Sequence, residues 1–430
     1  MQPAKMIEAM KSQRKKFVDY INQTYERIRS DTYKQRSKQK AEDFTRNRKM
    51  PFVPLICFML KSMKQSTQTA LEDHFFEEGD IEHMRQQSFS EARHKVKVSA
   101  FSELFEMTVQ IAYEGYYDTW HGYRLSAIDG SDIALPADEE LRQYYGTVGR
   151  NNTSVSARGS IFYDLLNKVV MDADIAPMSY DERSMAAAHI YGLEKIGQKR
   201  RELTLFDRGY ASFDLIRVCK EQNVRFLMRV KRGFNKEIDN MPEGMGKVTL
   251  EGDDGETIDV RVIKFMLPSN EMEMLITDIW DKHLGVEDFK ALYFMRWGVE
   301  TKYDEVKNKL EIENFTGRTR TAIEQDFYAT MYLSNVASAA CWEAQEIASR
   351  QRTDSDNKYD YHVNINHAVG TLKRRFIMAM VEEDPDRQED LIAKILFLLA
   401  KSVCQVRPNR TVAREPVRKA KFHHNRKSNC

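Results

Sequence analysis

The sequence predicts an α/β protein in which a mixed sheet with helices packed against it is flanked by helical regions at both ends. Three observations support this prediction. Short apolar runs alternate with helical patterns over residues 124–231, which is typical of strands and helices that build one sheet. Glycine and charged residues punctuate alternating runs over 232–288, which indicates a β-rich insertion. Helical periodicity dominates the remainder of the chain.

The length and composition predict a multidomain globular protein. A chain of 430 residues with 42% apolar residues is long enough for two or three domains. We expect a mostly helical, basic N-terminal domain over 1–115, an α/β domain over 116–350, and a helical C-terminal region with a basic tail over 351–430. The formal net charge of +1 argues neither for nor against a nucleic-acid partner, so the distribution of charge must decide.

The cysteines and apolar runs predict a cytoplasmic protein with no membrane partner. The charged N-terminus lacks the apolar stretch of a secretory signal. The longest apolar run, residues 52–60, is far shorter than the ~20 residues that span a bilayer. Scattered cysteines without a CxxC pair indicate reduced thiols rather than a disulfide framework. They are Cys57, Cys219, Cys341, Cys404 and Cys430.

The elements follow in order along the chain. In the N-terminal region, helical patterns cover 52–71 and 88–113, with Ser88 or Ser90 as a possible cap, and a basic cluster of Arg46, Arg48 and Lys49 precedes them. That cluster is either a solvated face or a DNA contact. We then expect a strand at 123–136, a strand pair at 157–175, a serine-capped helix at 179–196 and a strand at 202–207. A helix at 213–223, a strand at 224–231 and the antiparallel insertion at 232–288 follow. The last expected helices cover 293–307, 322–350 and 361–406.

The stretch "YFMRWGVETKYDEVK", residues 293–307, carries an unusual polar stripe. At about 100° per residue, Tyr293, Arg296, Glu300 and Lys307 lie within about one sixth of a helix circumference. Apolar residues such as Val299 lie on the opposite side. One interpretation is a solvent-facing ladder of charge pairs. The other is a binding surface, because aromatic rings beside cations suit a ligand that has phosphates and stacked bases.

Two aspartates are placed at apolar strands. Asp129 lies in "LSAIDGSD", and Asp207 ends the strand in "LTLFDRGY". Each residue on its own could be a turn former or a helix cap. If the strands are neighbours, the two side chains meet, and a helix across the sheet could add Glu300. Three carboxylates would repel one another unless divalent cations neutralised them, and oxygen-only ligation suits Mg²⁺. Two such ions ~3.5–4 Å apart can promote phosphodiester cleavage.

These residues resemble the DDE transposases of the insertion-sequence-four group, which includes the transposase of transposon five. The helix motif of that group is Tyr, two residues, Arg, three residues, Glu, six residues, Lys, and all four positions match here. Asp129 in "IDG" and Asp207 in "FDRGY" also match, and the resemblance covers about 124–337. It implies a ribonuclease-H-like catalytic core with the β-rich insertion placed before the glutamate helix.

The resemblance also implies an activity and its partners. Asp129, Asp207 and Glu300 would hold two Mg²⁺ ions, with Mn²⁺ able to substitute. A homodimer would cut transposon-end inverted repeats and join the freed 3′ ends to double-stranded target DNA in the bacterial nucleoid. The cleavage could proceed through a hairpin or through another intermediate. Tyr293, Arg296 and Lys307 would hold the phosphates and nearby nucleotides of the cleaved end, through the fork of Arg and the point charge of Lys.

Several alternatives remain open in the sequence. Asp132 competes with Asp129, and Asp304 competes with Glu300, although we favour Asp129 and Glu300. Arg318 and Arg320 could extend the DNA track, and Trp280 is either a base-stacking or a core residue. Arg229, Lys231 and Arg232 either contact phosphates or are solvated, and His423 and His424 read as part of the basic tail. The alternative functions are a non-catalytic, transposase-derived DNA-binding protein and a ribonuclease-H-like nuclease without strand transfer.

Overall fold

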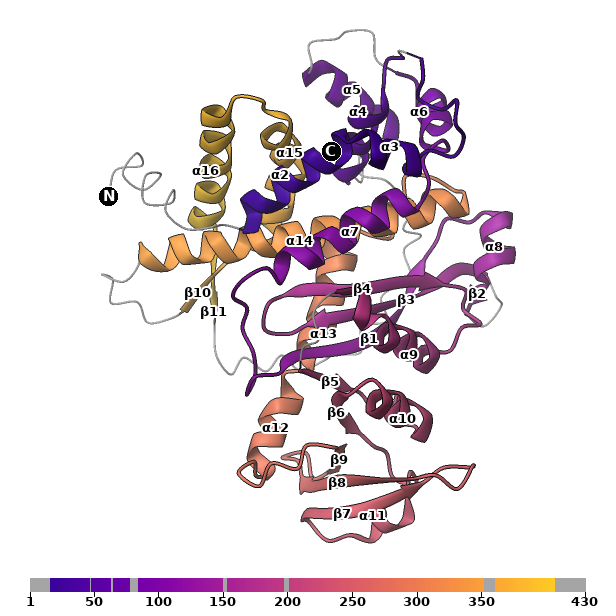
Figure 1. The fold of residues 1–430 in the computed structure, drawn as a ribbon, viewed down its shortest axis with the longest axis vertical. Coiled ribbons are helices and arrows are strands. Elements are labelled where there is room, and N and C mark those ends of the chain that lie inside the picture. The colour runs from indigo at the N-terminus through magenta and orange to yellow at the C-terminus, as the bar shows by residue number, and fades with distance from the viewer. Residues whose placement is uncertain are drawn as a thin grey trace. The chain divides into compact units, whose positions relative to one another are not determined.

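The computed structural model describes residues 16–46, 48–62, 65–77, 84–149, 153–196, 201–351 and 360–406 (Figure 1). Contacts divide the chain into two compact units. The helical unit comprises residues up to 112, 134–143 and 305 onward, and the sheet unit comprises 113–133 and 144–304. The expected basic tail lies outside the described residues, and the division into three domains stays a prediction. Within the described ranges, no helix combines the length and apolarity needed to cross a bilayer.

The helical unit is built from helices of both ends of the chain and a small antiparallel sheet formed by its last two strands. Its elements are α2 (Lys16–Arg29), α3 (Asp31–Ser37), α4 (Phe52–Leu60), α5 (Thr67–Glu77), α6 (Gln86–Arg93), α7 (Ser99–Ala112), most of α8 (Glu139–Tyr145), the π-helical turn η2 (Glu305–Lys309), α14 (Arg320–Arg350), β10 (Asp360–Val363), α15 (Ile365–Val381), α16 (Pro385–Lys401) and β11 (Val403–Val406).

Helix α14 is the central helix of this unit, and α7 and α16 pack against it (Figure 1). It begins where the Thr319 side chain accepts a hydrogen bond from the Ala322 N–H at 3.3 Å, as an N-cap residue does. Apolar side chains such as Phe327 and Leu333 are fully buried along it. The predicted long helix over 322–350 is therefore confirmed, and hydrophobic burial holds it in place.

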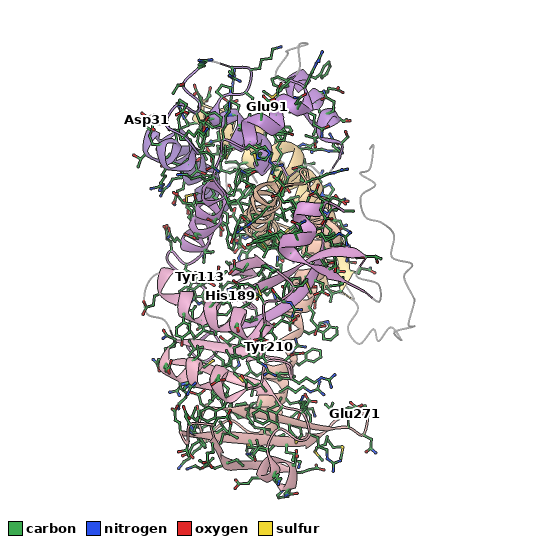
Figure 2. The ribbon with its side chains drawn as sticks, turned by 90° about the vertical axis from the view of Figure 1, so that its right-hand side faces the viewer. Asp31, Glu91, Tyr113, His189, Tyr210 and Glu271 are labelled. Carbon is green, nitrogen blue, oxygen red and sulfur yellow. The ribbon has the colours of Figure 1, made fainter. Side chains whose placement is uncertain are left out.

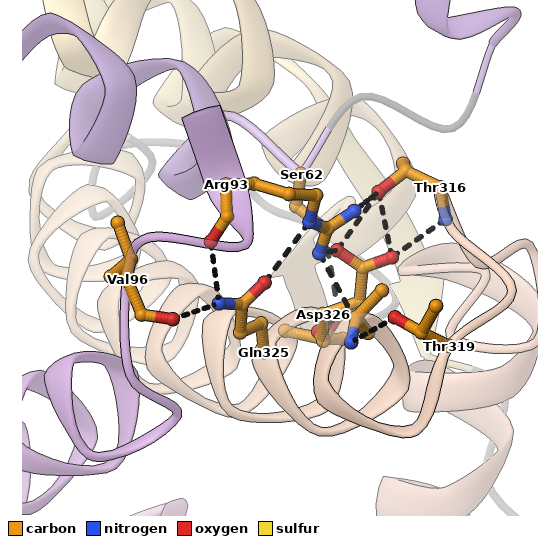
Figure 3. Close-up of polar contacts among 9 residues, drawn as sticks. Ser62, Arg93, Val96, Thr316, Thr319, Gln325 and Asp326 are labelled. Atoms are coloured by element: carbon orange, nitrogen blue, oxygen red, sulfur yellow. Dashed lines mark hydrogen bonds and ion pairs between the residues drawn. The ribbon is translucent and has the colours of Figure 1, made fainter. Parts of the chain in front are cut away.

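A buried polar network joins α6 to α14 (Figure 3). The Arg93 guanidinium donates from Nη2 to Asp326 Oδ1 at 2.9 Å, from Nη1 to Thr316 Oγ1 at 2.7 Å, and from Nε to Gln325 Oε1 at 3.0 Å. Only 2% of the Arg93 side chain is exposed, so its charge depends on these partners for compensation. The network fixes the beginning of α14 against the N-terminal helices.

The sheet unit contains one large mixed sheet with helices around it. Its elements are β1 (Arg124–Ala134), β2 (Thr147–Val148), β3 (Ser154–Asp164), β4 (Val169–Ala176), α9 (Glu182–Gly192), η1 (Leu193–Ile196), β5 (Glu202–Phe206), α10 (Phe213–Glu221), β6 (Val224–Arg229), α11 (Lys236–Asn240), β7 (Gly244–Glu251), β8 (Thr257–Met266), β9 (Met272–Thr277), α12 (Val286–Phe294) and α13 (Trp297–Asp304).

The strand order of the large sheet is β2-β3-β1-β5-β6-β9-β8-β7, with β4 paired to β3. Strands β1, β5 and β6 are parallel to one another, and β3 and β4 form an antiparallel hairpin. The register of β1 and β5 is supported by a buried ion pair, in which Arg124 Nη2 lies 2.6 Å from Glu202 Oε1. The α/β class and the strand pair predicted at 157–175 are therefore confirmed.

The predicted β-rich insertion is confirmed and extends the main sheet. Strands β7, β8 and β9 pair antiparallel in sequence order, and β9 continues antiparallel onto β6. Buried and exposed positions alternate along β7 and the first half of β8, which is the pattern of strands that cover a core with one face. The insertion is therefore joined to the main sheet through the pairing of β9 with β6.

Five helix predictions require correction. The patterns at 52–71 and 88–113 are each two helices, and α6 begins after Arg85 without a side-chain cap, so the predicted serine caps are wrong. Helix α9 is capped by Asp181, not by a serine. The region 361–406 begins and ends with the paired strands β10 and β11. The stretch 293–307 is also not one helix, because it is interrupted between α12 and α13 and again at η2.

Candidate active site

Asp129 lies on β1, and Asp207 directly follows β5, which is the parallel neighbour of β1 in the sheet. The last register pair of β1 and β5 is Ala127 with Leu205, and continuing this register by two residues leads to Asp129 and Asp207. Residues paired across parallel strands point to the same face of a sheet. The two aspartates therefore share one face near the carboxyl end of β5, where polar sites commonly form in α/β proteins.

The carboxyl group of Asp129 is half-buried and surrounded by charge. Its Oδ1 atom accepts a hydrogen bond from the Gly130 N–H at 3.0 Å. Burial raises the pKa of Asp129 to about 6, and the negative charges of Asp207 and Glu300 act in the same direction. The Arg296 guanidinium and the Gly130 N–H oppose this rise. The structure thus brings all three predicted carboxylates into one electrostatic environment.

Helix α13 carries Glu300 to this face, and Tyr303 anchors the helix. The buried Tyr303 hydroxyl donates to the backbone carbonyl oxygen of Asp129 at 2.9 Å and to that of Gly159 at 3.1 Å. Gly298 permits a close approach as well, because a Cβ atom there would lie 2.9 Å from Leu165 Cδ2. These contacts hold α13 against β1 and β3, with Glu300 one turn before Tyr303.

The helix interruption places Arg296 in a tight turn. The Arg296 N–H donates to the Tyr293 carbonyl oxygen, and the Gly298 N–H donates to the Met295 carbonyl oxygen. Both hydrogen bonds reach the third preceding residue, whereas those of an α-helix reach the fourth. Later, the Leu310 N–H bonds to the Glu305 carbonyl oxygen in η2, a wider turn. The stretch 293–307 is therefore not one regular helix, although Arg296 still contacts Glu300 and lies beside the Tyr293 ring.

Arg296 connects the two remaining motif residues of the sheet unit. Its Nη2 atom lies 2.6 Å from Glu300 Oε1, and its Cζ atom lies 5.7 Å from the centroid of the Tyr293 ring. Burial raises the pKa of Tyr293 to about 12, so this phenol stays protonated at neutral pH. The buried Nε atom of Arg296 has no hydrogen-bond partner among the described residues. A donor is therefore left available for an oxygen-rich ligand.

The other predicted site residues are placed as follows. Asp132 and Asp304 are exposed, whereas Asp129 and Glu300 are half-buried. The choice of Asp129 over Asp132 and of Glu300 over Asp304 as site residues stays a prediction. Lys307, Arg318 and Arg320 belong to the helical unit. There, Lys307 Nζ lies 3.8 Å from Glu313 Oε1, Arg320 Nε lies 2.7 Å from Glu324 Oε1, and Arg318 is exposed. Their expected DNA contacts stay predictions. In the sheet unit, Arg229 Nη2 lies 2.6 Å from Glu273 Oε2, and Trp280 is 45% exposed.

The carboxylate set fits a divalent metal ion by its donor chemistry. The available donors are carboxylate oxygens, and burial, together with the negative charges of Asp207 and Glu300, raises the pKa of Asp129. In the parts of the chain that are described, no three His, Cys, Asp or Glu side chains already form a metal-binding group. Glu300 is instead paired with Arg296. An ion at this place would therefore compete with the guanidinium for that carboxylate.

A Ser-His-Asp arrangement lies elsewhere in the sheet unit, around His189 of α9 (Figure 2). The Nδ1 atom of His189 is 2.8 Å from Asp172 Oδ2, and its Nε2 atom is 2.9 Å from Ser160 Oγ. These residue types match a hydrolase triad. Ser160 is only 2% exposed, however, so no substrate reaches its hydroxyl. The three side chains anchor α9 to β3 and β4.

Sequence reasoning missed three residues beside the carboxylates. Tyr210 lies three positions after Asp207 in "FDRGY", and its hydroxyl is buried near the aspartates. Tyr303 follows Glu300 by one turn, and this spacing is the signal in the sequence that places it near the site. Glu182 begins α9 and lies over Gly130, where a Cβ atom would be 3.1 Å from its Cδ. No signal in the sequence predicted that contact.

Comparisons with known proteins point in one direction. The family model described as "Transposase DDE domain" matches residues 120–336, which is half of the chain. A candidate transposase, InsZ, of Escherichia coli (strain K12) is 30% identical over 133 residues. That alignment covers 30% of this chain and 43% of InsZ, so the chain spans less than half the length of this relative.

A solved structure gives a weaker similarity. It is a cryo-EM structure of the piggyBac transposase synaptic complex with hairpin DNA, with a TM-score of 0.46 and 10% sequence identity over 93% of this chain and 85% of that one. A similarity at this level supports no argument about fold or function. The family model covers the segment that includes Asp129, Asp207 and Glu300. This chain belongs to the family of transposase DDE domains.

Proposed function

We propose that this chain is a DNA transposase of the insertion-sequence-four group. It cuts an insertion sequence at its terminal inverted repeats and joins the freed ends to target DNA. Family membership supports the general activity. The tyrosine, arginine, glutamate and lysine at the group's spacing support the narrower assignment.

The strand order supports a ribonuclease-H-like core. Without β2 and the insertion, the order is β4-β3-β1-β5-β6, with a β3–β4 hairpin beside three parallel strands. In this arrangement β1 and β5 are central neighbours, so the first two carboxylates of the site come from the middle of the sheet. The third comes from a helix placed after the insertion.

The observation that carries the proposal is the shared electrostatic environment of Asp129, Asp207 and Glu300. These carboxylates would hold two divalent ions, Mg²⁺ or Mn²⁺, which when bound lower the pKa of an attacking water or 3′-hydroxyl and stabilise the leaving oxygen. Glu300 would exchange its ion pair with Arg296 for this role. The released guanidinium then has several free donors for a phosphate of the DNA end.

The remaining motif residues would hold and orient DNA. Tyr293, protonated and packed under Arg296, offers a hydroxyl donor and a ring face to the cleaved end. Lys307 would contribute a point charge, and Arg318 and Arg320 would extend the phosphate track. Base-specific recognition of the ends is assigned to the basic N-terminal region. The chain would act as a homodimer, because two ends must be brought together.

The test uses the purified full-length chain and labelled DNA that carries both flanks of its gene. Wild type is expected to nick the ends and join them to a target plasmid only with Mg²⁺ or Mn²⁺. The Asp207→Ala variant is expected to bind the ends without cleaving them. The Asp214→Ala variant is the control, because this exposed aspartate on α10 is paired with Arg217 on the same helix and should not affect cleavage.

Three results would contradict the proposal. Cleavage by Asp207→Ala at the wild-type rate would remove Asp207 from the site. End binding by wild type without any cleavage would favour a non-catalytic DNA-binding protein. Cleavage without joining would favour a nuclease that lacks strand transfer.

A further inference from the structure

The hydroxyl group of Tyr210 is buried without a hydrogen-bond partner. The residue lies directly after β5 in the sheet unit and is only 2% exposed (Figure 2). Among the described residues, no donor or acceptor contacts its Oη atom. A buried, unpartnered hydroxyl is costly, and few remain in native proteins without a functional reason.

The charges around Tyr210 include two carboxylates of the candidate active site, Asp129 and Asp207. Burial raises the pKa of Tyr210 far above its usual value, and the charges of Asp129, Glu182 and Asp207 raise it further. Arg158 opposes them, and its Nη1 atom is already paired with Glu182 Oε1 at 2.8 Å. The phenol is therefore a neutral group that can donate one hydrogen bond and accept others.

The loop that carries Tyr210 is fixed on both sides. The Gly209 N–H donates to Asp207 Oδ1 at 2.6 Å, and the Tyr210 N–H donates to the Asp207 carbonyl oxygen at 3.2 Å. From α9, Arg183 Nε donates to the Gly209 carbonyl oxygen at 2.9 Å. The centroid of the Tyr210 ring lies 5.9 Å from the centroid of the Phe206 ring. The backbone and ring of Tyr210 are thus fixed before any ligand arrives.

We infer that Tyr210 is a positioning residue of the carboxylate site. Its hydroxyl donates a hydrogen bond to a carboxylate oxygen of Asp129 and accepts one from a water on the divalent ion that Asp129 and Asp207 hold. Mg²⁺ and Mn²⁺ retain water ligands, and those waters are strong donors that need nearby acceptors. The inference rests on the proposed function. The hydroxyl lacks a hydrogen-bond partner in the metal-free chain, and we expect it to gain one when the divalent ion is bound.

This role predicts opposite effects on folding and on metal binding. Without metal, Tyr210→Phe removes an unpartnered polar atom and keeps the ring, so the fold loses nothing. With metal, the variant lacks an outer hydrogen bond that orients Asp129 and a bound water. Losses of this kind typically weaken metal binding about 10–100-fold.

The experiment measures Mn²⁺ binding to the full-length chain without DNA, through the electron paramagnetic resonance signal of free Mn²⁺. We expect Tyr210→Phe to raise the Kd for Mn²⁺ about tenfold and to melt without metal at or above the wild-type temperature. The matched control is Tyr332→Phe, which removes a buried hydroxyl 2.8 Å from Thr24 Oγ1 in the helical unit. It should leave the Kd unchanged. Asp129→Asn should abolish binding.

Two results separate this inference from the proposed function. If wild type binds Mn²⁺ and Tyr210→Phe binds it equally well, the role of Tyr210 is wrong and the proposed function stands. If wild type binds no Mn²⁺ with or without transposon-end DNA, both are overturned. A lower melting temperature of Tyr210→Phe without metal would instead assign the hydroxyl a purely structural role and would also overturn the inference.

Discussion

The Nη2 atom of Arg296 lies 2.6 Å from Oε1 of Glu300, and this pair joins the turn after α12 to the first turn of α13. Both side chains act on Asp129, since Arg296 lowers its pKa and Glu300 raises it. The guanidinium therefore compensates part of the negative charge that the three carboxylates create. We interpret it as the group that a divalent ion displaces and that DNA phosphate then binds.

Replacement of Arg296 by lysine tests this exchange. Arg296→Lys keeps the positive charge but removes the unpartnered Nε donor and the planar fork. We expect the affinity for a pre-cleaved transposon end to fall about 10–100-fold, as the loss of a charge-assisted hydrogen bond of about 1.5–3 kcal/mol implies. A gel-shift titration measures it. Arg217→Lys, on α10 with ion pairs to Asp214 and Asp254, is the control and should bind normally.

The raised pKa of Asp129 predicts a pH-dependent stability of the metal-free chain. An aspartate in an unfolded chain has a pKa of ~3.9, whereas burial raises that of Asp129 to about 6. The folded state therefore binds this proton more tightly. The group stabilises the fold below about pH 4, and this contribution is lost as the pH rises through about 6.

Asp129→Asn cannot ionise and should escape that loss. At pH 7.5 without metal, its free energy of unfolding should exceed that of wild type by at most about 3 kcal/mol, and at pH 4 the difference should approach zero. Urea unfolding at both pH values measures this. Asp132→Asn, at an exposed position on the same strand, should change stability by no more than about 0.5 kcal/mol at either pH. Equal effects of the two variants would contradict the described environment of Asp129.

The Arg93–Asp326 pair predicts where the helical unit is most sensitive. Asp326→Ala leaves a buried guanidinium without its carboxylate and the Thr316 N–H without its acceptor. We expect a loss of about 3–5 kcal/mol in the free energy of unfolding, measured with urea. Lys394→Ala breaks the exposed pair with Asp390 and should cost less than about 1 kcal/mol. The double variant Arg93→Met/Asp326→Leu removes both charges. If it is as unstable as Asp326→Ala, the unpaired charge of Arg93 is not the cause of the lost stability.

The sequence was sufficient to predict the strands that carry Asp129 and Asp207, because buried strands leave continuous apolar runs bounded by polar residues. It also located the insertion that becomes β7, β8 and β9. It could not predict the break before α13 or the turn η2. Those depend on where the backbone meets other elements, such as Gly298 against Leu165, and a periodic pattern contains no information on that contact. The buried hydroxyl of Tyr210 was hidden for the same reason.

The most direct test of the account is the rate of DNA cleavage by Glu300→Gln, compared with Asp304→Asn, in saturating Mg²⁺ on DNA that carries both flanks of the gene. Glu300 is half-buried beside Asp129, whereas Asp304 is exposed one turn later. We expect Glu300→Gln to bind the ends and to lose more than about 100-fold in rate, beyond the losses seen for outer-shell residues. Asp304→Asn should cleave at the wild-type rate. The reverse pattern, with Asp304→Asn inactive and Glu300→Gln active, would contradict the assignment of the third carboxylate.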